Sequence, residues 1–403
     1  MNRRHLPRSP RIADRMASIE PFHVMDVLAK ARALEAGGRD IVHMEIGESD
    51  FETPVPIREA AIRAADEGKT HYTPAVGLPA LRKAISDYYL SDHGVSVSPE
   101  RIIVTPGASG ALLLAAGVLI NPGDQVLMAD PGYPCNRHFV RLMEGEAVGI
   151  AVDASTDYQL TAGLLEQHWA ERTVAVLLAS PSNPTGTVVS ADSLREMADV
   201  VAARGGRLIV DEIYHGLIYG NQGSDAMAET ALALPGNASD ELFVINSFSK
   251  HFCMTGWRLG WMVAPEAYVR ELDKLAQNIF LAAPTLSQHA ALAAFEPESR
   301  EILAGYRDAY HERRDFLLPA LRELGFDIPV EPAGAFYLYA DCSRFTDDSY
   351  AFALDVLEKA GVAITPGKDF GSNQPERYVR FAYTTSLDRL KEGVERLARY
   401  LSK

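Results

Sequence analysis

The sequence predicts an α/β fold built on a mostly parallel sheet flanked by helices. Helical periodicity at residues 108–120 and 190–204 lies between apolar runs, as in βαβ units. The runs lack polar alternation, which is typical of strands buried on both faces. They comprise residues 101–105, 125–129, 173–178, 207–211 and 242–246. From about residue 295, amphipathic stretches alternate with short strand-like runs, which indicates a smaller α+β domain.

The segments that flank these runs are expected to be mainly helical. Residues 22–36 have apolar side chains at helical spacing and stop at Gly37-Gly38, a C-terminal glycine signal. A short strand is predicted next, at residues 41–46, and two helices follow at 55–67 and 78–93. The last third is predicted to contain helices at 297–324, 348–360 and 386–401 and strands at 334–340, 362–364 and 378–382.

Composition excludes several classes of protein. The 403 residues carry a net charge of −15, which disfavours a nucleic-acid-binding face. The longest apolar run, 111–120, is too short to span a membrane. The basic stretch at residues 2–15 is interpreted as a solvated arm. Three cysteines form neither a disulfide framework nor a zinc pattern, so a soluble, cytoplasmic protein without a metal site is expected.

The most informative stretch surrounds Lys250, which follows a predicted strand end. Partly desolvated lysines have a lowered pKa and attack carbonyl groups. Ser247, Ser249 and Arg258 lie close by in sequence and can hold a phosphate. A carbonyl-binding lysine beside a phosphate anchor indicates pyridoxal 5'-phosphate (PLP). The alternative, an exposed lysine with a surface arginine, would be favoured if this stretch stood alone.

A second signal is the turn from a predicted strand into a helix at Gly107-Ala108-Ser109. Small residues there let backbone N–H groups approach an anion at the helix N-terminus. The turn lacks the Lys-Ser/Thr pair of a nucleotide-binding P-loop. On its own it is equally typical of a packing feature.

Two further strand ends carry polar residues. Asn183 lies in a proline-rich turn after the run at 173–178, where it can present its amide to a ligand. Asp211 ends an apolar strand and needs a positive partner, for which a protonated pyridine nitrogen is suitable. Tyr214 follows three residues later and can donate to a phenolate. The alternatives are a plain turn, a helix-capping aspartate and a core tyrosine.

In order and spacing, these motifs resemble the class I/II aminotransferases of fold type I, from about residue 20 to the C-terminus. The resemblance rests on Gly107-Ala-Ser, Tyr133, Asn183-Pro-Thr-Gly, Asp211-x-x-Tyr214, Ser247-Phe-Ser-Lys250, Arg258 and Arg380. It implies PLP as the cofactor, amino acid and 2-oxo acid substrates, and a homodimer with shared active sites. It also implies a large PLP-binding domain at 51–294, a small domain from both chain ends at 20–50 and 295–403, and an N-terminal arm at 1–19.

The resemblance assigns a role to each motif residue. Lys250 forms an aldimine and then moves a proton, Asp211 keeps the pyridine nitrogen protonated, and Tyr214 with Asn183 binds the phenolic oxygen. Tyr133 stacks on the ring. The phosphate is held around Gly107, Ala108 and Ser109 and by Ser247, Ser249, Arg258 and the partner's copy of Tyr72. Gly47, Asn183 and Arg380 bind the substrate carboxylate.

Substrate choice depends on two positions. Ser109 stands where bacterial aspartate-specific relatives often have a lysine, and residues 279–281 are apolar where the other major aspartate group has an arginine. Because an unpaired carboxylate in an apolar pocket is costly, a neutral or aromatic donor is expected, with 2-oxoglutarate or pyruvate as acceptor. An aspartate aminotransferase and a PLP-dependent C–S β-lyase remain alternatives. A ligand sensor of a transcription regulator is disfavoured, and Cys253 and His251 are expected to be structural.

Overall fold

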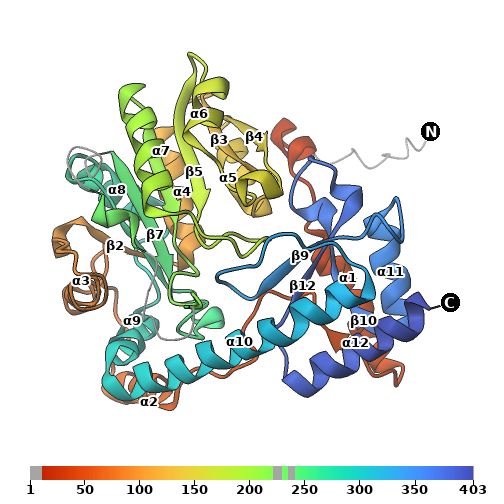
Figure 1. The fold of residues 1–403 in the computed structure, drawn as a ribbon. Helices are drawn as coiled ribbons and strands as arrows, with labels where there is room; N and C mark the ends of the chain where they lie inside the picture. The colour runs from red at the N-terminus through yellow and green to blue at the C-terminus, as the bar shows by residue number, and fades with distance from the viewer. Residues whose placement is uncertain (1–10, 221–228, 235–240, 403) are drawn as a thin grey trace, which may run out of the picture.

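The computed structural model describes residues 11–220, 229–234 and 241–402 (Figure 1). The predicted basic arm therefore lies partly outside the described residues, including Arg3, Arg4, His5 and Arg8. Within the described ranges, no helix is long and apolar enough to cross a membrane. The same ranges contain no cluster of three metal-ligating side chains. The cysteines Cys135, Cys253 and Cys342 are all free.

A seven-stranded sheet forms the centre of the larger part of the molecule, in the order β2-β8-β7-β6-β5-β3-β4. Only β8 runs antiparallel to its neighbours, so the prediction of a mostly parallel sheet is confirmed. The strands are β2 Ile102–Thr105, β3 Gln125–Asp130, β4 Glu146–Ala151, β5 Thr173–Ala179, β6 Arg207–Asp211, β7 Leu242–Ser247 and β8 Gly260–Val263. The sequence interpretation missed β4, an edge strand in which only Ile150 is buried, and the four-residue β8.

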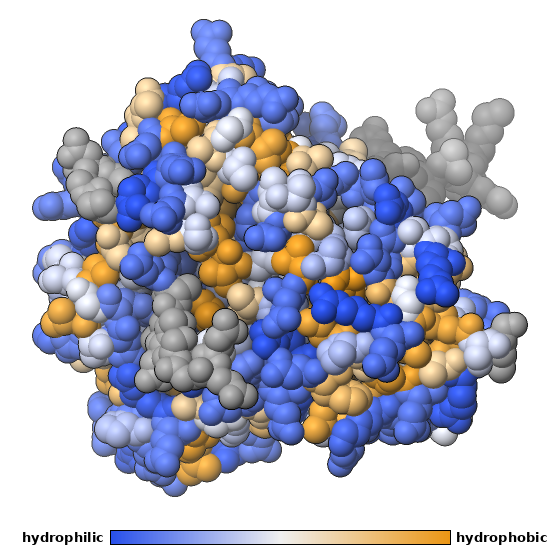
Figure 2. All heavy atoms as spheres, viewed as in Figure 1, coloured by the Kyte–Doolittle hydropathy of each residue, from blue (hydrophilic) through white to orange (hydrophobic). Residues whose placement is uncertain are grey.

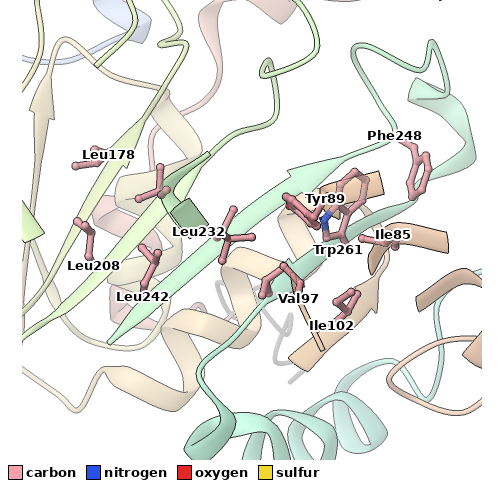
Figure 3. Packing of buried hydrophobic residues seen from close by; sticks show 14 of the residues in the cluster. Ile85, Tyr89, Val97, Ile102, Leu178, Leu208, Leu232, Leu242, Phe248 and Trp261 are labelled. Atoms are coloured by element: carbon pink, nitrogen blue, oxygen red, sulfur yellow. The ribbon is translucent and has the colours of Figure 1, made fainter. Parts of the chain in front are cut away.

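Helices cover both faces of this sheet (Figure 1). The helices of this larger part of the molecule are α2 Val55–Asp66, α3 Pro79–His93, α4 Gly107–Leu119, α5 Pro134–Leu142, α6 Ala162–His168, α7 Ala191–Ala203, α8 Glu266–Ile279 and α9 Thr285–Leu292. Successive β7 residues point to opposite faces, because side chains alternate along a strand. Phe243 and Ile245 pack with α4 and α8, whereas Val244 packs in the cluster that includes α3 and α7 residues. In that second cluster the Trp261 indole donates to the Tyr89 hydroxyl at 3.0 Å (Figure 3).

The two chain ends meet in a second, smaller group of elements. Strand β1 (Val42–His43) pairs in parallel with β10 (Val362–Ala363). An antiparallel sheet has the order β11-β12-β9, from Thr365–Pro366, Tyr378–Ala382 and Tyr337–Asp341. The helices of this smaller group are α1 His23–Ala36, α10 Pro297–Leu324, α11 Ser349–Ala360 and α12 Leu387–Leu401. The long α10 packs against α2 at one end and α12 at the other, so it joins the two groups of elements (Figure 1).

Two predicted strands are shorter than expected. The run at 41–46 forms a strand only at Val42–His43, because the carbonyls of Glu45 and Ile46 accept hydrogen bonds from side chains and not from a neighbouring strand. The run at 334–340 becomes a strand only from Tyr337. Hydrophilic residues cover most of the face in Figure 2, with smaller hydrophobic areas between them. The division into domains at 51 and 295 stays a prediction.

Candidate active site

A cavity of about 490 Å³ opens at the carboxyl ends of β5, β6 and β7. In a parallel sheet this edge collects the residues that follow neighbouring strands, which is why distant sequence motifs meet here. The cavity is also bordered by α1 and by the segment after β1. The predicted site residues that line it are Gly47, Ala108, Ser109, Tyr133, Asn183, Asp211, Tyr214, Ser247, Ser249, Lys250, Arg258 and Arg380.

Lys250 lies just beyond β7, and its ammonium group donates to the Gly47 carbonyl. Its Nζ is 5.8 Å from the ring centres of both Tyr214 and Phe336. Burial, assisted by the positive charge of Arg380, lowers the pKa of Lys250 to about 8. A lysine in this state supplies a neutral amine at mildly alkaline pH, which is what nucleophilic attack on a carbonyl requires.

Asp211 is the last residue of β6 and is almost fully buried. Its carboxylate accepts a hydrogen bond from the Ile213 N–H at 3.1 Å. Burial raises the pKa of Asp211 to about 7, and the neighbouring Glu212 adds to the shift. A buried carboxylate of this kind is stabilised by a cationic ligand group placed against it.

Small residues and hydroxyls form one end of the cavity, at the start of α4. Gly107 has a φ of +71°, and a Cβ there would come within 2.7 Å of the Arg258 Nη2 atom. The Ser247 hydroxyl donates to the Ser249 hydroxyl at 3.0 Å and accepts from the Ser249 N–H at 3.1 Å. A helix N-terminus, two hydroxyls and a guanidinium therefore face one spot, which is the donor set for a phosphate.

Arg380, on β12, is buried and lines the same cavity. Its Nη1 donates to the Asn183 Oδ1 at 2.8 Å, and its Nη2 donates to the Glu45 carbonyl at 2.6 Å. The guanidinium carbon lies 4.2 Å from the centre of the Tyr337 ring, whereas Nε has no hydrogen-bond partner. This planar cation, fixed by β12 and the segment after β1, is suited to a substrate carboxylate.

Tyr337 was missed by the sequence interpretation. Its hydroxyl lies 2.7 Å from the Tyr214 hydroxyl, and a Cβ on Gly47 would overlap it. Tyr337 belongs to β9, in an apolar run that resembles any other core strand, so no local signal distinguished it. It links Tyr214, Arg380 and the Gly47 turn into one buried group.

Helix α1 was also missed as part of the site. Phe22, just before the helix, lines the cavity together with Val24, Met25, Leu28 and Arg32. The N-terminus of α1 is fixed by Asp369, whose two oxygens accept from the N–H groups of His23 and Val24 at 2.7 and 2.8 Å. The helical periodicity predicted α1 itself. It did not show that the apolar residues Met25 and Leu28 of this helix border a ligand cavity.

Four features considered in the sequence analysis lie away from the cavity wall. Tyr72 is 84% exposed, in the loop between α2 and α3, and does not line the cavity of its own chain. Cys253 contacts the Ser49 hydroxyl at 3.3 Å, and burial raises the pKa of its thiol to about 11, which agrees with a structural role. His251 is half-buried, and its ring centre lies 4.9 Å from that of Phe252. Ile279 and Leu281 are exposed and also lie outside this cavity.

Comparisons with known proteins agree with this geometry. Residues 39–397 match the family model of aminotransferase class I and II. The chain is 39% identical to a valine–pyruvate aminotransferase of Mycobacterium tuberculosis, over 96% of this chain and 97% of that protein. It is 36% identical to a (5-formylfuran-3-yl)methyl phosphate transaminase of Methanocaldococcus jannaschii, over 97% and 100% of the two chains. It is 35% identical to an aspartate aminotransferase of Geobacillus stearothermophilus, over 97% and 99%.

The fold matches as well. A crystal structure of an aminotransferase from M. tuberculosis superposes with a TM-score of 0.92 at 38% identity, covering 98% of this chain and 100% of that one. The chain therefore belongs to the class I/II aminotransferases, and it is a PLP-dependent enzyme that transfers amino groups. The expectations for fold class, enzyme class and cofactor are confirmed.

The cavity residues fit PLP. Gly107 has a φ that residues with a Cβ rarely adopt, so its bare backbone can approach a phosphate beside Arg258. Asp211 is a buried carboxylate whose pKa is raised by burial, and a pyridinium nitrogen placed against it would stabilise its charged form. Lys250 lies in the same cavity, with a pKa low enough to present a neutral amine.

Proposed function

We propose that the enzyme takes the amino group from a neutral L-amino acid, aliphatic or aromatic, and passes it to a 2-oxo acid. The observation that carries this proposal is the apolar wall that Phe22, Met25 and Leu28 contribute from α1. Ser109, which also lines the cavity, offers a hydroxyl and no positive charge. An apolar donor side chain loses water against this wall at a gain of about 25 cal/mol per Å².

Some residues of the cavity bind the cofactor, and Lys250 also transfers a proton. Lys250 would hold the cofactor covalently, and its free amine would move the proton at the substrate's α-carbon. PLP, when bound, supplies an electrophilic carbonyl carbon and a ring that accepts electrons. Asp211 would keep a proton on the ring nitrogen, while Tyr214 and Asn183 would hydrogen-bond the ring oxygen. Tyr133 would pack on the ring face.

The two ends of the cavity hold anionic groups. Gly107, Ala108, Ser109, Ser247, Ser249 and Arg258 bind the cofactor phosphate at one end. Arg380, with Asn183 and the Gly47 N–H, binds the substrate carboxylate at the other. Fixing both anions orients the α-carbon toward Lys250, and such positioning is a large part of the rate enhancement of enzymes.

We also propose a homodimer in which Tyr72 completes the phosphate site of the partner. Its 84% exposure and its absence from the cavity of its own chain support a role across an interface. We retain the domain division at residues 51 and 295, because the pairing of Val42 with Val362 joins both chain ends. A cytoplasmic location suits the three free cysteines.

A donor screen tests the proposal. Single-turnover amino transfer is measured by the change in cofactor absorbance with valine, leucine, phenylalanine and aspartate. We expect kcat/KM to favour the neutral donors. Leu28→Ala should reduce kcat/KM for leucine roughly fivefold to tenfold, because the substrate side chain loses the apolar surface that Leu28 buries against it. The control Leu90→Ala, at an exposed leucine of α3, should have no effect.

The relative from G. stearothermophilus makes aspartate the second candidate donor. Equal or greater kcat/KM with aspartate would reject the neutral-donor proposal and favour an aspartate aminotransferase. Release of a thiol and pyruvate from S-alkylcysteine, faster than amino transfer, would favour elimination instead.

A further inference from the structure

Among the described residues, Arg32 is the one charged side chain of α1 without an ion-pair or hydrogen-bond partner. Its neighbours on the helix are all paired, so α1 is not simply a helix with loose surface charges. The pairs are Lys30 with Glu358, Glu35 with His43 at 3.1 Å, and His23 with Asp26 at 3.7 Å.

Arg32 borders the active-site cavity. It lies seven residues after Met25 and four after Leu28, so the three side chains share one face of the helix. That face is the wall that the proposed donor side chain contacts. Arg32 is exposed, so its guanidinium group is in contact with water. Its aliphatic side-chain carbons extend from this wall.

Four cations line the cavity, and three of them already have a role. Lys250 and Arg258 serve the cofactor, and Arg380 serves the carboxylate next to the reacting carbon. The amino acceptor enters the same cavity as the donor, and a dicarboxylic acceptor brings a second carboxylate that needs its own partner. Arg32 is the remaining cation that borders this space.

We propose that Arg32 binds the distal carboxylate of the acceptor and so selects a dicarboxylic 2-oxo acid, 2-oxoglutarate, over pyruvate. This inference rests on the proposed function and names its acceptor. A bidentate guanidinium–carboxylate pair supplies both charge and direction. When a neutral donor occupies the cavity, the flexible arginine keeps its head in water and only its stem faces the ligand.

Two carboxylates line the cavity, and Asp211 is assigned to the cofactor nitrogen, so Glu48 is the one that opposes this arrangement. Glu48 lines the cavity and also lines the adjacent hollow beside Cys253, which no α1 residue borders. We therefore place the distal carboxylate of the acceptor on the α1 side of the cavity, where Arg32 is the charged residue.

The test compares acceptors on holoenzyme that has first been aminated by whichever donor reacts best. The ratio of kcat/KM for 2-oxoglutarate to kcat/KM for pyruvate is measured in wild type, Arg32→Gln and Arg32→Lys. We expect Arg32→Gln to lower this ratio by roughly 10- to 100-fold, as loss of a charged hydrogen bond does. Arg32→Lys should retain part of the selectivity. An unchanged ratio in Arg32→Gln would overturn the inference.

The matched control is Arg204→Gln, an exposed arginine at the end of α7 that does not border the cavity. It should leave the ratio unchanged. A fall equal to that of Arg32→Gln would mean that overall charge, and not a specific contact, sets the preference.

A binding measurement gives a readout independent of turnover. Glutarate and valerate have the same chain length and differ by one carboxylate. By calorimetry, wild type should bind glutarate at least tenfold more tightly than valerate, and Arg32→Gln should lose this difference. If wild type bound glutarate and valerate equally well, the inference would be overturned, even if the variant failed to fold. Failure of every neutral donor would reject the proposed function alone, because acceptor selectivity is measured separately.

Discussion

At the scale of single residues, the site depends on charges held where water is scarce. Burial lowers the pKa of Lys250 to about 8 and raises that of Asp211 to about 7. Both shifts bring a normally charged group toward its neutral form near physiological pH. Such paired shifts are a property of catalytic centres, and here they fall on the two residues that the proposed mechanism uses most.

The lowered pKa of Lys250 predicts how cofactor-free enzyme takes up PLP. Only the neutral amine attacks a carbonyl, and its fraction rises as pH passes through about 8. The initial rate of covalent attachment should therefore increase roughly tenfold from pH 7 to pH 9. Absorbance after mixing measures the rate, and Lys250→Ala should show no attachment that borohydride can trap. A pH-independent rate in wild type would contradict the assignment.

The sequence indicated the cavity-lining residues at strand ends better than those that reach the cavity from other elements. Asn183, Asp211 and Lys250 follow strands of a buried sheet, and strand ends are recognisable from apolar runs. Tyr337 and Arg32 reach the cavity from elements joined to it only by tertiary packing. Nothing in their local sequence distinguishes a core tyrosine or a surface arginine from a ligand contact.

At the scale of elements, α1 connects stability to substrate binding. Asp369 accepts from two N–H groups at its start, and the same helix presents Met25 and Leu28 to the cavity. Asp369→Ala should cost about 1–2 kcal/mol of unfolding free energy, because the cap and its favourable dipole interaction are lost. It should also lower kcat/KM for neutral donors, as the wall loses its anchor.

A second capping aspartate gives the control. Asp348 accepts from the N–H groups of Tyr350 and Ala351 at the start of α11, and it does not line the cavity. Asp348→Ala should lose comparable stability in chemical denaturation yet keep wild-type kcat/KM. Equal effects of both variants on kcat/KM would show that the activity loss follows general destabilisation.

The other end of α1 is connected to the Arg380 site through His43. Its Nδ1 lies 2.7 Å from buried Glu45, and its Nε2 lies 3.1 Å from Glu35 of α1. The hydrogen bond with Glu45 raises the pKa of His43 to about 9, against a desolvation effect in the opposite direction. Because the folded-state pKa is raised, the stabilisation is complete below about pH 6.5 and is lost as pH rises through about 9.

This linkage predicts a pH-dependent difference between wild type and His43→Gln. Wild type should be more stable by about 1–2 kcal/mol near pH 6, a figure reduced for partial exposure of the imidazole. The difference should shrink by pH 9.5. Urea unfolding at both values measures it, and a constant difference would show that His43 acts through packing alone.

Prediction of elements was most accurate where strands are buried on both faces. The five apolar runs became β2, β3, β5, β6 and β7. Strand β4 has exposed positions and small residues, so it lacked the apolar run that marked the others. The run at 41–46 is apolar enough for a strand, but its carbonyls are used by Arg380, Thr365 and Thr384, which are distant in sequence.

At the scale of the whole molecule, the proposed sharing of sites predicts complementation. Tyr72→Ala and Lys250→Ala should each be poorly active alone, the second almost inactive. Mixed at equal amounts under conditions that allow subunit exchange, half of the dimers are hybrids with one intact site each, so about a quarter of wild-type activity should appear. Light scattering checks the dimer mass. No gain on mixing, with exchange verified, would argue against Tyr72 acting across the interface.

The pairing of β1 with β10 has a consequence for the order in which the protein is made. Val42 leaves the ribosome early, but its partner Val362 is synthesised tens of seconds later. Most of the seven-stranded sheet emerges between them and can form first, while the N-terminal segment has no strand to join. Chaperones that bind nascent chains would therefore find α1 and its apolar face uncovered until the end of translation.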